Sequence, residues 1–192
     1  NGDIYVNRPI FAGSSVGRAL RNLIENNTIT DLIKDAYVVP ANGWEAAGIR
    51  LDVDADQNTI QKNTIGRLGS GITWDFFNRT MGIFPENGSD ANIIRENVVF
   101  DVTEGCYMES SNSTGNNVGN QYLNNVGYDC GRAGLIMMRS DNAIVRNNIF
   151  SESITGIYMT DISIANAGNS FSDNLYWIAG ATGSTLINRW GV

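Results

Sequence analysis

The sequence predicts an all-β solenoid, a chain that winds into stacked coils of short strands. Three observations predict it: a phrase built on two asparagines five residues apart recurs along the 192 residues, a glycine followed by a short alternating strand recurs with it, and the 25 Asn and 21 Gly suit corners between strands. Helical solenoids need amphipathic helices, whereas β-branched residues and period-two alternation favour strands.

The asparagine phrase sets the coils. Clear copies begin at Asn22, Asn58, Asn92 and Asn142, with weaker copies at Asn120 and Asn169. The anchors that follow are Asn27, Asn63, Asn97, Asn125, Asn148 and Asn174, in steps of 36, 34, 28, 23 and 26 residues. Amides at one register can hydrogen-bond from coil to coil, and a plain turn role for asparagine predicts the same solenoid. We therefore expect about six coils in one domain, residues 1–192.

The glycine phrase places one strand in each coil. It covers residues 48–52, 71–75, 105–109, 134–138 and 156–160. In the first coil this strand follows its anchor late, and in the second coil extra residues follow the strand. The spacing therefore predicts insertions near 34–47 and 77–90, and long excursions from a solenoid tend to lie at a binding face.

Composition excludes several kinds of site. The chain has no His, so serine–histidine and cysteine–histidine nucleophiles and His-rich zinc sites are excluded. The formal charge of −7 argues against nucleic acid as a partner, and no apolar run is long enough to span a membrane. Cys106 and Cys130 are expected far apart along a coil, which favours free thiols over a disulfide.

The repeats between about Ile4 and Trp177, together with the closing run 173–177, resemble the right-handed parallel β-helix of the pectate-lyase-like superfamily. This resemblance implies a right-handed parallel β-helix and an extracellular or secreted protein whose partner is a polysaccharide or oligosaccharide. Members include lyases, glycoside hydrolases, epimerases and phage tailspikes, and the fold does not decide among them. We expect further coils or a partner subunit to cover the ends of the solenoid.

Three carboxylates form the candidate catalytic set. When the glycine-initiated strands are aligned, Asp52, Asp75 and Glu109 fall in one outward-facing column on consecutive coils. Neighbouring strands lie about 4.8 Å apart, and glycoside hydrolysis uses two carboxyl groups about 5–9.5 Å apart. One carboxyl group would protonate the leaving oxygen, and the other would activate water or attack carbon. An exposed strand face that merely carries acidic residues is the alternative.

Candidate substrate-binding residues surround this column. They comprise two residues on the same strand face, Arg50 and Tyr107, and three in or beside the insertions, Tyr37, Trp44 and Arg79. Aromatic faces stack on sugar rings and arginine binds acidic groups.

No cofactor or metal site is predicted. The alternating run Asp52, Asp54, Asp56 offers calcium as an alternative, but the turn glycine and closing glutamate of a calcium loop are missing. Three functions remain open: a glycoside hydrolase, which we place first; a calcium-dependent polysaccharide lyase with Arg50 or Tyr107 as base; and a non-catalytic glycan-binding or structural β-helix.

Overall fold

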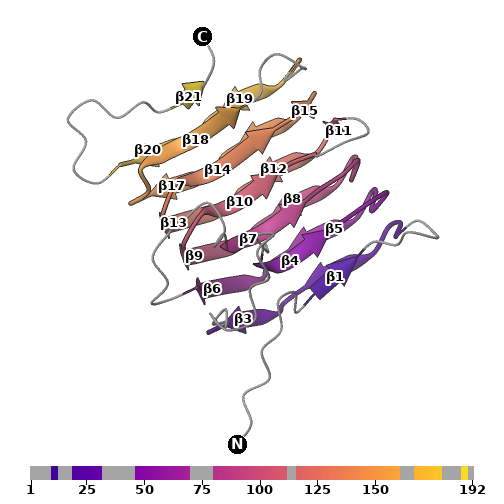
Figure 1. Cartoon of the computed structure of the whole chain (residues 1–192), viewed down its shortest axis with the longest axis horizontal. Helices are drawn as coiled ribbons and strands as arrows, with labels where there is room; N and C mark the ends of the chain where they lie inside the picture. Colours follow the sequence, from indigo (N-terminus) through magenta and orange to yellow (C-terminus); the bar gives the residue numbers. More distant parts are fainter. Residues whose placement is uncertain are drawn as a thin grey trace, which may run out of the picture.

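A computed structural model describes residues 10–12, 19–31, 46–69, 80–111, 116–160, 167–178 and 187–189. In these residues the chain is a right-handed parallel β-helix, as predicted, and its coils stack from the indigo strands of the N-terminal part to the yellow strands near the C-terminus (Figure 1). Three long sheets run along the solenoid, and every strand pair in them is parallel. Within this part of the chain no helix is long and apolar enough to cross a membrane.

The first sheet, called sheet A here, has seven strands. In spatial order they are β1 (Ile10–Ala12), β4 (Ala46–Leu51), β7 (Thr80–Pro85), β10 (Gly105–Glu109), β14 (Ala133–Met138), β18 (Thr155–Thr160) and β21 (Ile187–Arg189).

Two six-stranded sheets complete each coil. Sheet B contains β2 (Leu23–Glu25), β5 (Thr59–Gln61), β8 (Ile93–Arg95), β12 (Gln121–Leu123), β16 (Ile144–Arg146) and β19 (Ser170–Ser172). Sheet C contains β3 (Thr28–Thr30), β6 (Thr64–Leu68), β9 (Val98–Val102), β13 (Val126–Cys130), β17 (Ile149–Ser151) and β20 (Leu175–Trp177). Two short strands on consecutive coils, β11 (Asn117–Val118) and β15 (Ser140–Asp141), form a separate two-stranded parallel sheet. Six strands in each of sheets B and C confirm about six coils.

The anchor asparagines form a continuous ladder between sheets B and C. Each side-chain amide donates to the Oδ1 of the anchor one coil further on, over distances of 2.9–3.1 Å, in the order Asn27, Asn63, Asn97, Asn125, Asn148 and Asn174. A second ladder runs through Asn22, Asn58, Asn92 and Asn120. The asparagine side chains therefore link neighbouring coils by hydrogen bonds, in addition to occupying the turns.

The left-handed corner residue is the one before each ladder asparagine. Lys62 precedes Asn63 at a φ of 56°, and Glu96 precedes Asn97 at a φ of 55°. These positions accept many residue types, so the ladder side chains, and not backbone tolerance alone, explain why asparagine recurs at its register.

The core fills the space between the three sheets. It consists of apolar residues such as Ile49 and Ile83 from sheet A, Ile60 and Ile94 from sheet B, and Ile65 and Val99 from sheet C, all 0 % exposed. A second apolar cluster, Ala47, Met81, Phe84, Met108, Ala133, Ile136 and Tyr158, lies on the outer side of sheet A and is also buried.

The strand of the second coil lies elsewhere than predicted. β7 spans Thr80–Pro85 and pairs with β4 through Ile49–Ile83 and Arg50–Phe84, so the described part of the predicted insertion 77–90 contains a strand of sheet A. Gly82 begins this phrase, whereas residues 71–75 lie outside the described residues. Of the insertion predicted at 34–47, residues 34–45 also lie outside them, and Ala46 and Ala47 belong to β4.

Candidate functional site

Arg50 lies on the outer side of sheet A, as predicted, at the centre of a polar cluster. Its Nη2 forms ion pairs with Glu86 and with Asp52, the latter at 3.3 Å. Its guanidinium lies 5.3 Å from the centre of the Phe84 ring, the neighbouring position on β7. In the described part of the chain, the buried Nε of Arg50 has no hydrogen-bond partner. Arg50 therefore joins two carboxylates and keeps one donor unused.

Asp52 is the more exposed of the two carboxylates in this cluster. Its Oδ1 accepts hydrogen bonds from the backbone N–H of Val53 and from Nδ2 of Asn87, both at 3.0 Å. Two hydrogen bonds and the ion pair with Arg50 orient this carboxylate, whose side chain is 16 % exposed, while the Glu86 side chain is 2 % exposed. The cluster therefore presents one pre-oriented carboxylate, that of Asp52, which is held in place by the buried Arg50 and its partner Glu86.

The carboxylate beside Asp52 on the next coil is Glu86, which the sequence analysis missed. The register Leu51–Pro85 places Glu86 directly after its strand, as Asp52 follows β4. The predicted neighbour, Asp75, lies outside the described residues. A signal for Glu86 exists in the sequence, because Asp52 and Glu86 each lie six residues before a ladder asparagine, Asn58 and Asn92.

Glu109 does not share a face with Asp52, and here the predicted column is wrong. The ladder pairs Gly105 with Ala133 and Tyr107 with Leu135, whereas the alignment had paired Gly105 with Gly134. A slip of one residue moves each side chain of a strand to the opposite face. Glu109 consequently points into the core, and the coil neighbour of Glu86 is Ser110.

Tyr107 is likewise a core residue and not a surface one. It is 0 % exposed, and its hydroxyl lies 3.1 Å from the carbonyl oxygen of Asn97 and 2.9 Å from that of Val126. Burial raises its pKa well above the ordinary value. Tyr107 therefore lies apart from the Arg50 cluster and is not placed to act as a base on a substrate.

Glu109 lies in a buried polar network. Its Oε1 accepts a hydrogen bond from Nδ2 of Asn120 at 2.9 Å, and its Oε2 accepts one from the hydroxyl of Tyr122 at 3.2 Å. Burial raises the pKa of Glu109 from 4.5 to about 7, although the hydrogen bonds from Asn120, Ser140 and Tyr122 oppose the shift. No solvent reaches the carboxyl group, which is 0 % exposed. It can take up a proton near neutral pH, but it is not open to a polymer.

The remaining predicted site residues lie outside the described residues. These are Tyr37, Trp44, Asp75 and Arg79. The structure thus places four of the eight predicted residues: it brings Arg50 and Asp52 together and separates Tyr107 and Glu109 from them.

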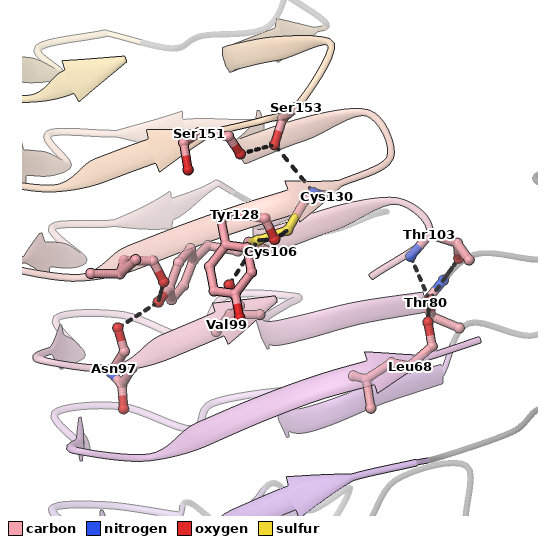
Figure 2. Close-up of a disulfide and its surroundings, with 12 residues drawn as sticks. Leu68, Thr80, Asn97, Val99, Thr103, Cys106, Tyr128, Cys130, Ser151 and Ser153 are labelled. Carbon is pink, nitrogen blue, oxygen red and sulfur yellow. Dashed lines mark hydrogen bonds between the residues drawn. A yellow bond between two sulfur atoms is a disulfide. The ribbon is translucent and has the colours of Figure 1, made fainter. Parts of the chain in front are cut away.

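The two cysteines form a disulfide, contrary to the expectation of free thiols. Cys130 ends β13 and Cys106 lies in β10, and their Cα atoms are 5.5 Å apart across the corner between sheets C and A (Figure 2). Cys130 lies 24 positions after Cys106, which is close to the length of one coil. Cys130, at the corner that ends β13, therefore lies beside β10, the sheet A strand of the preceding coil. Disulfides persist in oxidising compartments and are rare in the cytosol.

The fold and the disulfide together define a class, a disulfide-linked parallel β-helix of the kind found outside the cytoplasm. A comparison with family models gives the particular family. The family model described as "Periplasmic copper-binding protein (NosD)" matches residues 75–188, more than half of the chain, and the chain belongs to this family. The family's periplasmic description agrees with a location outside the cytoplasm in the broad sense. No curated protein and no solved structure matches the chain.

The residues of this chain do not fit a copper site. Imidazole, thiolate and thioether are the side-chain ligands that favour copper, but the chain has no His and both cysteines are in the disulfide. Met81, Met108, Met137 and Met159 are at most 3 % exposed and lie in apolar clusters, and the fifth methionine, Met138, is partly buried and packs against the outer cluster. Among the described residues no group of three or more His, Cys, Asp or Glu side chains is arranged to hold a metal ion. We therefore assign no metal-dependent step to this protein.

Proposed function

We propose that this protein is an extracytoplasmic β-helix that binds a polysaccharide without cleaving it, through the partly exposed edge of the Arg50 cluster. The observation that carries the proposal is the carboxylate of Asp52, which two hydrogen bonds and an ion pair orient while its side chain stays partly exposed. A fixed carboxylate accepts hydrogen bonds from sugar hydroxyls with little loss of side-chain entropy. The neighbouring amide of Asn87 supplies a half-buried polar group beside it.

The burial of the cluster favours binding over hydrolysis. Hydrolysis requires two carboxyl groups that both reach the scissile bond or its water. Glu86 is 1 % exposed and paired with Arg50, so the ion pair would have to open before Glu86 met a substrate. Elimination by a lyase has less support, because Arg50 is bound by two carboxylates and Tyr107 is in the core.

Binding can be tested by affinity electrophoresis and calorimetry with a panel of neutral and acidic polysaccharides. We expect Asp52→Ala to weaken binding about tenfold or more, because it removes the oriented acceptor. The control is Asp54→Ala, an exposed carboxylate two residues further along the same turn, which should leave affinity within about twofold. If both variants bind as the parent protein does, or if no polysaccharide binds the parent, the proposal is wrong.

A second candidate, hydrolysis by Asp52 and Glu86, rests on the register that places these two carboxylates on neighbouring coils beside one arginine nitrogen. The bound polysaccharide is incubated with the protein and new reducing ends are measured. Turnover that is lost in both Asp52→Asn and Glu86→Gln would establish the hydrolase, whereas no reducing ends over background would leave binding as the function.

A further inference from the structure

The outer face of sheet C carries a column of aromatic side chains that the function proposed above does not use. The register places Phe100 beside Tyr128, Tyr128 beside Ser151, and Ser151 beside Trp177 on four consecutive coils. The side chains between them along each strand, such as Phe150 and Val99, point into the core. Tyr128 is 37 % exposed and Trp177 is 67 % exposed, so this face of the sheet is open to solvent at those positions.

The first rings of the column are stacked along the axis of the solenoid. The rings of Phe100 and Tyr128 have centroids 5.2 Å apart and planes 7° from parallel. The guanidinium of Arg67 lies 5.9 Å from the centre of the Phe100 ring, one coil below. Gly66 makes room for that ring, because a Cβ there would lie 2.4 Å from Cζ of Phe100. β9 and β13 therefore supply two rings that lie about one strand spacing apart.

Ser151 leaves one position in this stack without a ring. Strands in a sheet lie about 4.8 Å apart, so the backbones at Tyr128 and Trp177 are about 9.5 Å apart. That separation accommodates one additional ring at about the spacing that Phe100 and Tyr128 already adopt. The serine side chain is too short to fill this position, so the face of Tyr128 directed toward Ser151 has no stacking partner from that strand.

We propose that the position above Ser151, between Tyr128 and Trp177, binds one pyranose ring of a neutral glycan. The C–H face of a sugar stacks on aromatic rings, while its hydroxyl groups need acceptors at the ring edge. Asp129 and Glu152 supply them: both are exposed, and each directly follows a residue of the column. Their charges repel the carboxylate of a uronic acid, which selects neutral sugars.

This inference rests on the proposed function for the class of ligand, but its residues belong to another sheet than Asp52. The test is calorimetry of the whole protein with cellohexaose, mannohexaose and tri-galacturonate as probes. We expect a neutral hexasaccharide to bind and the galacturonate to bind at least tenfold more weakly. Trp177→Ala should weaken binding of the neutral probe about tenfold, and Ser151→Trp, which fills the position with a side-chain ring, should abolish it.

The matched control is Leu175→Ala. Leu175 is on the same strand as Trp177 and is 60 % exposed, but it lies in the other outward column. Affinity unchanged by this control and lost in Ser151→Trp supports the site. The site is absent if no neutral probe binds, or if Trp177→Ala and Ser151→Trp bind as the parent does. Asp52→Ala separates the two proposals, since loss of affinity in that variant alone overturns this site and leaves the proposed function standing.

Discussion

At the scale of single residues, Glu109 shows how a break in a repeat creates a special environment. The second asparagine ladder runs from Asn22 to Asn120, but the next coil has Ala143 at that register, and Ala143 N donates to Oδ1 of Asn169. Asn120 therefore lacks the next amide oxygen and donates to Glu109 and to the carbonyl oxygen of Ser89. A buried carboxyl group replaces the missing rung, and its raised pKa follows from that burial.

The raised pKa of Glu109 makes stability depend on pH. The carboxyl group titrates near 4.5 when unfolded and near 7 when folded, so the folded protein binds more protons between these values. The free energy of unfolding should fall as pH rises from about 4.5 to about 7 and stay low above it. Glu109→Gln should remove this slope and raise the free energy of unfolding at pH 8 by up to about 3 kcal/mol.

Urea unfolding at pH 5 and pH 8 measures this effect. Asp54→Asn, which alters an exposed carboxylate, serves as the control and should keep the slope of the parent protein. A slope that persists unchanged in Glu109→Gln would show that other groups cause it.

At the scale of elements, the sequence predicts the coils well and individual strand registers poorly. The asparagine anchors identify strands β5, β8, β16 and their partners because each anchor must meet its neighbour within hydrogen-bond distance. The glycine-led strands lack such a fixed contact. Residues 71–75 and 82–86 each read as glycine, isoleucine, two further residues and an acidic residue, so the local pattern does not choose between them.

Packing chooses between such candidates. A Cβ at Gly82 would lie 2.3 Å from Val99 and 2.4 Å from the carbonyl oxygen of Cys106, so no larger residue fits at Gly82 itself, where β7 lies close to sheet C. In β10 the residue at that register is Cys106, and the glycine stands one position earlier. An alignment by glycine therefore slips by one in β10, which explains why the inward positions of Tyr107 and Glu109 could not be predicted.

The interior rungs of the anchor ladder should matter more than its ends. Asn97→Ala removes the donor to the carbonyl oxygen of Ile60 and the acceptor for the Asn63 backbone and side-chain amides, all in the buried interior. We expect a loss of about 3 kcal/mol in the free energy of unfolding. Asn27→Ala, at a half-buried rung nearer the end, should cost about 1 kcal/mol or less. Thermal and urea unfolding measure both losses. If Asn97→Ala and Asn27→Ala lose the same free energy of unfolding, the contribution of a rung does not depend on its burial.

At the scale of the whole molecule, the disulfide joins neighbouring coils of a solenoid whose strands are otherwise held by hydrogen bonds and apolar packing. Both cysteines are 0 % exposed within the main core. In a repeat protein each coil contacts mainly its neighbours, so a covalent link between two central coils opposes unwinding from either side. This link and the family's periplasmic description point to the same kind of compartment.

Reduction of this disulfide should destabilise the protein measurably. Closing a loop of 24 residues stabilises a fold by about 3 kcal/mol through the unfolded chain, which for a chain of this length corresponds to about 10 °C in melting temperature. We expect the melting temperature to fall by that amount when the protein is unfolded, reduced and refolded under reductant, with thiol titration confirming two free cysteines. The double variant Cys106→Ala/Cys130→Ala is the control, because its melting temperature should not respond to reductant. If the fully reduced parent protein melts as the oxidised one does, the link contributes nothing to the solenoid, and neighbouring coils are held by the asparagine ladders and the core alone.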